Sequence, residues 1–258
     1  MKNIRTVIVL VMTFILVGSY SSELHAQKEL KKRIAVFDFE DKTDHRVRWW
    51  QGGQTVGHGM SDMVVTALVK SGKYTVIERQ ELQKIMQEQK LGMSGAVTPE
   101  SAAEVGKLLG VEVAVIGSVT EFGYTESSKG GTFKGIGGGL KTTTASVGVD
   151  IRMINTSTGE ILAAENVRKK EKSRGVSFSK RDLSFKDQKK FDDSIVGKAT
   201  RKAVEKVVQS INKQMVNVPW SGKVIMEKNG VIYMNAGSTG GISVGDKFNV
   251  YRPGEDLI

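Results

Sequence analysis

The sequence predicts an α/β protein: a layered domain with long β-hairpin extensions, followed by a small C-terminal β module. Two observations support this prediction. Up to residue 122, segments rich in β-forming residues alternate with segments whose apolar residues recur at helical spacing. Beyond residue 219, short apolar runs are separated by turn residues. The first pattern favours a sheet covered by helices, and the second favours a separate small β structure.

The first part of the layered domain reads as strand, helix, strand, helix, helix and strand. Its opening strand, RIAVFDF, is rich in β-forming residues. Thr98 can cap the helix that Pro99 and Glu100 begin, and Gly72 and Gly110 follow helical patterns as end signals. The predicted elements are strands over 33–39, 74–77 and 111–122, and helices over 54–71, 81–90 and 98–110.

The second part of this domain contains two more strands and a long helix. From Ala145 to Met153 every second residue is apolar, which predicts a strand over 144–154 with one buried face. Turn residues over 155–160 predict that the chain returns as a strand over 161–167. Apolar residues at helical spacing predict a helix over 194–215.

The C-terminal module begins after Pro219. Strands are predicted over 223–226 and 231–234, because Asn229-Gly230 between them is a strong hairpin turn signal. A last strand is predicted over 247–251. The chain therefore divides into an N-terminal segment over 1–26, a layered domain over 27–217 and the C-terminal module over 218–258. Whether the sequence contains the whole of that module stays open.

Residues 1–26 predict a secretory signal peptide. Lys2 and Arg5 precede an apolar run that ends at Gly18, and a small residue, Ala26, stands at the expected cleavage site. The run is shorter than the ~20 residues that a membrane-spanning helix needs. We therefore expect an exported protein, located in the periplasm or at the periplasmic face of the outer membrane.

The composition limits the chemistry that is available. There is no cysteine, so disulfides, thiolate metal sites and cysteine nucleophiles are excluded. A net charge of +10 would suit nucleic acid, but an export signal argues against that partner. Most of the excess charge lies between Arg168 and Lys190, where a solvated surface or loop is favoured over contact with anionic lipid headgroups.

No catalytic pattern is found in the sequence. Metalloprotease and serine-hydrolase motifs are missing, and the three histidines are isolated from one another. The glycine run over 135–139 is followed by a predicted strand, whereas a phosphate-binding loop precedes a helix. The acidic group after the first strand lacks calcium-loop spacing; it comprises Asp38, Glu40, Asp41 and Asp44. We expect no enzyme activity, no cofactor and no metal.

A stretch of small and polar residues over 124–144 joins two predicted strands. Its large apolar residues are Phe133, Ile136 and Leu140. A membrane-spanning strand has about ten residues that alternate between lipid and water, and a ring of such hairpins leaves no edge unpaired. An extended hairpin of this kind could therefore enter a membrane, and a surface loop is the alternative.

Four stretches taken together resemble the curli secretion channel family, the CsgG/HfaB group of outer-membrane assembly and transport proteins. The resemblance covers about residues 34–178, and a looser one links the C-terminal module to flagellar-assembly envelope proteins. The four stretches are MVVTALV over 63–69, IERQELQ over 77–83, VIGSV over 115–119 and INTSTGEIL over 154–162.

This resemblance implies a ring-shaped secretion channel to which each copy donates two hairpins, here over 125–144 and 165–185. It implies that Phe133, Ile136 and Leu140 lie in the membrane hairpin. It places a constriction loop between the first strand and the first helix, so that Trp49, Trp50 and Gln54 line the constriction or contact a partner. The implied partners are further copies of the chain, an exported or envelope protein and the outer membrane.

Three features depart from the family pattern, one of which is that the first hairpin has just three large apolar residues for its lipid face. The lipidated cysteine of the channel is absent, and the second hairpin begins with Arg168-Lys-Lys-Glu-Lys172. A lipid-facing Lys or Arg near mid-bilayer costs about 2–4 kcal/mol. A second hypothesis therefore stands beside the channel: a soluble periplasmic scaffold of the same fold that binds another envelope protein.

Overall fold

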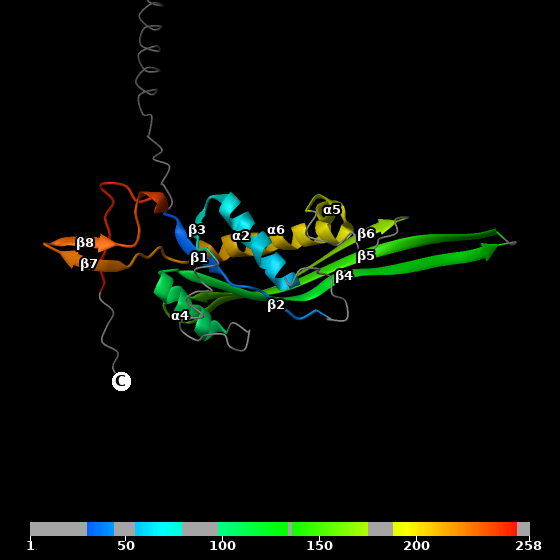
Figure 1. The fold of residues 1–258 in the computed structure, drawn as a ribbon, viewed down its shortest axis with the longest axis horizontal. Coiled ribbons are helices and arrows are strands. Elements are labelled where there is room, and N and C mark those ends of the chain that lie inside the picture. The colour runs from blue at the N-terminus through cyan, green and yellow to red at the C-terminus, as the bar shows by residue number, and fades with distance from the viewer. Residues whose placement is uncertain (1–29, 44–54, 79–97, 134–135, 175–187, 252–258) are drawn as a thin grey trace, which may run out of the picture.

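The structure is a computed structural model that describes residues 30–43, 55–78, 98–133, 136–174 and 188–251. In this part of the chain a six-stranded mixed sheet packs against helices, and a two-stranded sheet lies at one end of the molecule (Figure 1). The large sheet has the order β3-β1-β4-β5-β6, and β2 also pairs with β4. The predicted α/β class with a hairpin extension and a small β module is confirmed.

The elements follow the predicted order. The predicted helix over 81–90 lies outside the described residues, as does the segment 1–26. The described elements are β1 (Lys32–Val36), β2 (Glu40–Asp41), α2 (Val56–Ser71), β3 (Tyr74–Val76), α4 (Pro99–Leu109), β4 (Val113–Phe133), β5 (Ile136–Asn155), β6 (Ile161–Arg174), α5 (Gln188–Asp193), α6 (Ile195–Met215), β7 (Val224–Lys228) and β8 (Val231–Met234).

Both long helices begin with a hydroxyl cap. The Thr55 hydroxyl accepts a hydrogen bond from His58 N at 3.2 Å, and the Ser194 hydroxyl accepts one from Gly197 N at 2.9 Å. These side chains satisfy backbone donors that have no partner inside the helix. Gly72 ends α2 in the left-handed region with φ of 67°, which a residue without Cβ adopts readily.

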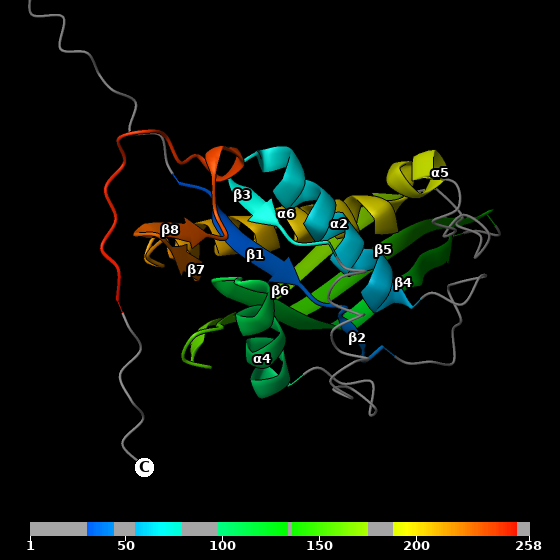
Figure 2. The same cartoon turned by 60° about the vertical axis from the view of Figure 1, so that its left-hand side comes forward.

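Helices α2 and α6 cover one face of the sheet and α4 covers part of the other (Figures 1 and 2). The larger core lies under α2 and α6. The smaller core lies between α4, the end of β1, the start of β4 and the end of β5, and it contains Ala35, Phe37, Ala102, Val111, Ala114, Ile116 and Ile154. The rest of that second face is not covered by any described helix.

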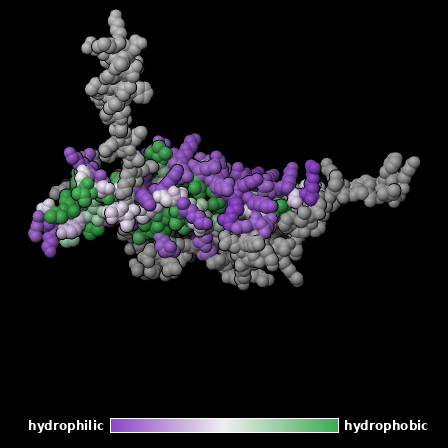
Figure 3. All heavy atoms as spheres, turned by 90° about the horizontal axis from the view of Figure 1, so that it is seen from above, coloured by the Kyte–Doolittle hydropathy of each residue, from purple (hydrophilic) through white to green (hydrophobic). Residues whose placement is uncertain are grey.

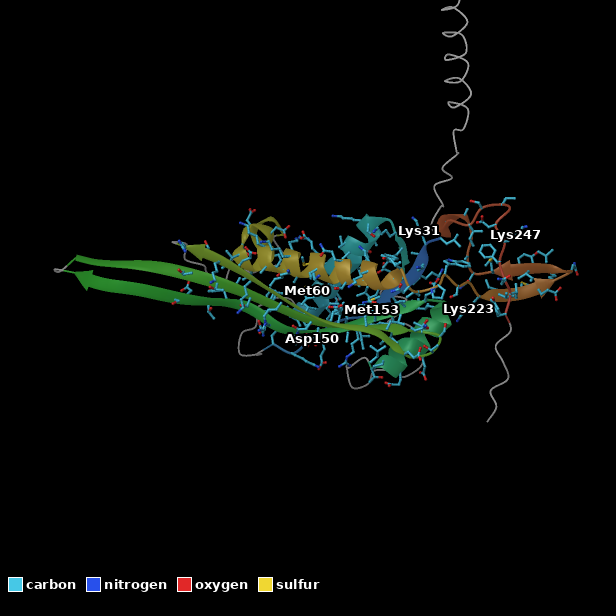
Figure 4. All side chains as sticks on the ribbon, turned by 180° about the vertical axis from the view of Figure 1, so that it is seen from behind. Lys31, Met60, Asp150, Met153, Lys223 and Lys247 are labelled. Carbon is cyan, nitrogen blue, oxygen red and sulfur yellow. The ribbon has the colours of Figure 1, made fainter. Side chains whose placement is uncertain are left out.

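The strict alternation in β5 predicted its buried face correctly. All five apolar side chains from Ala145 to Met153 are buried against the helix layer, whereas Asp150 lies on the side of the sheet away from α2 and α6 (Figure 4). The apolar stripe of α6 is likewise buried, with Val208 only partly so. These two apolar surfaces pack in the larger core together with side chains of β1, α2 and β4, and their burial helps to stabilise it.

The C-terminal module corrects one prediction. Strands β7 and β8 pair across Asn229 and Gly230, which both have positive φ as the turn requires. The predicted strand over 247–251 is wrong: these residues form no strand, and Phe248 instead contacts the Trp220 ring at a centroid distance of 5.2 Å. β-forming residues become a strand only where a neighbouring strand accepts their hydrogen bonds. Apolar side chains of β7 and β8 remain exposed (Figure 3).

Candidate functional site

The most distinctive feature of the molecule is the long hairpin of β4 and β5. Its register runs from Val113 opposite Asn155 to Phe133 opposite Ile136, with one irregularity between Val119 and Glu121. Among the side chains of the two strands whose burial is described, the last buried apolar ones before the tip are Phe122 and Ala145. Beyond them the hairpin projects from the layered domain, away from the end that carries β7 and β8 (Figure 1).

The predicted hairpin residues lie in this extension. Phe133 and Ile136 form the last backbone pair before the tip, and Leu140 lies opposite Lys129. The hairpin predicted over 125–144 is therefore paired along both arms. The strands do not end at 122 and 144, as the sequence pattern indicated, but continue through the glycine-rich stretch because each strand supplies the other's hydrogen bonds.

The first part of the basic stretch also forms a strand. β6 pairs with β5 as far as Arg174 opposite Thr142, so residues 168–174 are part of the sheet. The remainder of the hairpin predicted over 165–185 lies outside the described residues. The sequence favoured a solvated surface or loop over 168–190. For residues 168–174 the structure shows an ordered strand.

The two faces of β6 have different surroundings. Val167 is buried in the larger core, and further along the same face Glu171 Oε1 lies 2.5 Å from Lys202 Nζ of α6. The opposite face carries four exposed cations at alternate positions: Arg168, Lys170, Lys172 and Arg174. These four residues are called the cationic row below.

Arg168 shows how this face can hold a carboxylate. It forms an ion pair with Glu121 of β4, two strands away. Gly148 of β5 lies between them in the register, and a Cβ there would stand 3.1 Å from the Glu121 Cβ. The missing side chain thus lets the guanidinium reach across β5.

The residues predicted for the constriction, Trp49, Trp50 and Gln54, lie outside the described residues. The segments that flank them are well anchored. β2 pairs with β4 at Ser118 and Val119, and Gly57 packs so closely on the Phe39 carbonyl that a Cβ would stand 1.9 Å from its oxygen. The described residues on the two sides of 44–54 are therefore held in place, one side by β4 and the other by the segment between β1 and β2.

A buried carboxylate connects the layered domain to the C-terminal module. Glu112 accepts hydrogen bonds from Arg33 N at 2.5 Å and from Ser221 N at 3.1 Å. Burial raises the pKa of Glu112 above its usual range, although these two N–H donors lower it in part. Lys31 N also donates to Gly240 O at 2.8 Å. No sequence pattern pointed to Glu112, because its role depends on a residue far along the chain.

Three members of the acidic group after β1 are described, Asp38, Glu40 and Asp41, whereas Asp44 lies outside the described residues. Asp41 accepts hydrogen bonds from Thr43, and His58 lies 3.5 Å from Asp38 and 3.6 Å from Asp62. Within the described ranges no three or more His, Asp or Glu side chains are placed to hold a metal ion. Among the helices of the same residues, none is long and apolar enough to cross a membrane.

An α/β layer from which a long two-stranded hairpin projects is the architecture of the protein. The family model described as "Curli production assembly/transport component CsgG" matches residues 17–230, and the chain belongs to this family. Proteins of that description from Escherichia coli K12 and Salmonella typhimurium LT2 are 28% identical to it over 146 residues. These regions cover 53% of this chain and 52% of each relative, so the chain spans about half the length of the curated relatives it matches.

Two solved structures are more distant. Hypothetical protein CT253 from Chlamydia trachomatis superposes with a TM-score of 0.48 at 15% identity, over 71% of this chain and 97% of its own. Lipoprotein GNA1162 from Neisseria meningitidis superposes with a TM-score of 0.39 at 14% identity, over 72% of this chain and 99% of its own.

Proposed function

We propose that the protein is an exported, non-enzymatic component of a curli-type secretion system, and that its copies assemble into a ring that opens a pore in the outer membrane. Its partners are then other copies of the chain and an exported or envelope protein. Membership of the CsgG family supports the secretion role. The observation that carries the pore proposal is the continuous pairing of β4 and β5 beyond the core.

The length of the extension suits a membrane. The paired arms 125–133 and 136–144 project beyond the last large buried residues, and a membrane-spanning strand needs roughly 9–11 residues. Small residues dominate these arms, and Phe133, Ile136 and Leu140 are the large apolar ones. A second pair of arms would begin at β6, in keeping with the two hairpins that the family resemblance implies.

One observation favours a second function, a periplasmic scaffold that does not enter the membrane. The cationic row is exposed to solvent along the outer half of β6. In a ring pore these side chains have to face the water-filled lumen, because each would cost about 2–4 kcal/mol against lipid at mid-bilayer. The register of β4, β5 and β6 puts Phe133, Ile136 and Leu140 at positions of this same face, so they cannot at the same time form the lipid-facing side. In a scaffold no such restriction applies, and the row is simply a polar surface that can bind a partner.

Cell fractionation separates these two functions. The full chain and a variant in which residues 126–143 are replaced by Asn-Gly would be expressed in a Gram-negative host, and the membranes extracted with carbonate. Asn-Gly closes a two-residue hairpin between Thr125 and Thr144, which leave the core strands intact. We expect the full chain to stay with the outer membrane until detergent is added, and the shortened chain to be released.

Sizing of the detergent extract tests the ring. A single species several times the mass of one chain is expected from the full protein and a monomer from the shortened variant. Release of the full chain by carbonate, as a monomer in both buffer and detergent, would reject the pore and leave the scaffold. Limited proteolysis of the shortened variant serves as the folding control, because an unfolded variant would be digested completely.

A further inference from the structure

The open face of the sheet carries a repeated arrangement of side chains that nothing described so far uses. Along β6 the cationic row places a cation at every second residue. Across from each cation, β5 and β4 carry only glycine, serine or threonine at the next three positions: Ser146 and Gly123, Thr144 and Thr125, Thr142 and Ser127. The first position differs, because Glu121 lies across from Arg168.

The molecule therefore shows what one of these positions binds. Arg168 is paired with the Glu121 carboxylate across Gly148. Lys170, Lys172 and Arg174 occupy equivalent places with no carboxylate opposite, and within the described part of the chain none of them is paired with an acidic side chain. Among the described residues, the other charges of β4 and β5 on this face are Glu121, Asp150 and Arg152, and Glu40 of β2, level with Ser118, is paired with Lys42. The outer half of the face therefore has an excess of cations.

The spacing of the row selects the shape of its ligand. Successive cations lie two residues apart on one strand, or about 6.8 Å, and alternate side chains of another extended chain repeat at the same distance. A membrane surface is held by a broader cluster of cations spread over a plane. A single file of cations beside a floor of small side chains fits one extended polypeptide.

We propose that the cationic row is a docking site for an acidic, extended polypeptide whose carboxylates occur at every second residue. Three carboxylates of the polypeptide would each pair with one of Lys170, Lys172 and Arg174. Each pair would resemble the ion pair between Arg168 and Glu121. That this polypeptide is an exported or envelope protein rests on the proposed function, whereas the binding itself does not.

The test measures fluorescence anisotropy of a labelled peptide of alternating Glu and Thr with the full mature chain at low salt. The triple variant Lys170→Gln, Lys172→Gln, Arg174→Gln is compared with Lys198→Gln, Lys206→Gln, Lys213→Gln, which removes the same charge from exposed positions of α6. We expect the row variant to weaken binding roughly tenfold, because it removes three ion pairs together although each exposed pair contributes little alone. We expect the α6 variant to weaken binding less than twofold, because it removes no contact with the peptide. Added salt should remove the difference.

Two further probes make the outcome decisive. A peptide of equal composition with Glu-Glu-Thr-Thr repeats should bind more weakly than the alternating one. Binding to vesicles with anionic lipid should be equal for the natural chain and the row variant, because the proposed membrane insertion uses the β4–β5 hairpin. Equal loss of peptide binding in both variants, equal affinity for both peptides, or a loss of vesicle binding confined to the row variant would each overturn the proposal. None of these measurements depends on secretion. A result that rejects peptide docking can therefore be told apart from a result that rejects the pore.

Discussion

Glu112 shows how a single buried residue can join two parts of a chain. Its carboxylate accepts N–H groups from β1 and from the segment that leads into the C-terminal module. Arg33 lies in the same region, where its NH2 group donates to Leu109 O at 3.1 Å and its Nε has no partner among the described residues. The joint is therefore polar and sensitive to the charge on Glu112.

The variant Glu112→Gln should change both stability and its pH dependence. At neutral pH we expect a loss of about 1–3 kcal/mol, because the amide NH2 cannot accept the hydrogen bond that one carboxylate oxygen accepts. Since burial raises the pKa of Glu112 in the folded protein from its ordinary 4.5, its protonated form stabilises the fold. That contribution is complete below about pH 4.5 and is lost as the pH rises through the folded-state value.

Urea unfolding at several pH values measures this effect. The free energy of unfolding of the natural chain should fall more steeply above pH 4.5 than that of Glu112→Gln. Glu205→Gln, on an exposed position of α6, is the matched control and should follow the natural chain. Parallel curves for all three proteins would show that Glu112 does not titrate differently on folding.

At the scale of elements, the first turn of each long helix packs directly against the backbone of another segment. Gly57 of α2 and Gly197 of α6 lie in the first turns, where a Cβ would stand 1.9 Å from Phe39 O and 1.8 Å from Phe191 O. A helix that starts this close can place its first buried side chains deep in the core. The same closeness leaves no room for a larger residue.

The variant Gly197→Ala should therefore destabilise the protein by about 1–3 kcal/mol, as overpacking does. Ala favours helix over Gly, so a loss of stability would identify the steric contact as the dominant effect. Gly237→Ala is the control, because nothing lies within 4 Å of a Cβ there and its backbone is extended. Thermal unfolding of the two variants decides the matter; a rise in the midpoint for Gly197→Ala would contradict the packing described here.

Elements with a regular apolar pattern were predictable from the sequence, and elements imposed by a neighbour were not. β5 and α6 were predicted with their buried faces because their apolar residues repeat at the period of the structure. α5 was missed, since it is short and, among its described side chains, Phe191 is the one in the large core. The charged end of β6 has no strand pattern of its own and is extended because β5 pairs with it.

The candidate site was predictable only in outline. The glycine-rich hairpin and its position between two core strands followed from composition and spacing. The alternate spacing of the cationic row is visible in the sequence, and it predicts that the four residues share one side of a strand. What lies across from that side was not predictable, because it depends on the strands with which β6 pairs. The pair between Arg168 and Glu121 depends on the register of three strands and on Gly148, and no local pattern contains that information.

At the scale of the molecule, the hairpin and the C-terminal module project from opposite ends of the layered domain (Figure 1). The module is joined by few contacts, among them those of Glu112 with Ser221 and Lys31 with Gly240. Val218 is the last residue of the larger core. These observations indicate that the layered domain can fold without the module.

A chain that ends at Pro219 tests this division. We expect it to unfold cooperatively with near-natural helix content, measured by far-ultraviolet circular dichroism during urea unfolding. Its stability should fall by about 1–3 kcal/mol, because the buried Glu112 carboxylate loses a hydrogen-bond donor. Adding Glu112→Gln to the truncated chain is the control, and it should cost less there than in the full chain. Loss of the cooperative transition would show that the module is part of the same folding unit.

The first strand of the sheet is completed by the last helix. Lys32 Nζ donates to Met215 O at 2.5 Å, and these residues are 183 positions apart. Strands β4, β5 and β6 are neighbours in sequence and can pair as soon as they exist, whereas β1 pairs on its two sides with β3 and β4, which both follow it. A chain delivered N-terminus first would therefore keep one edge of its opening strand unpaired until β4 has arrived, and in that interval the edge is open to a chaperone.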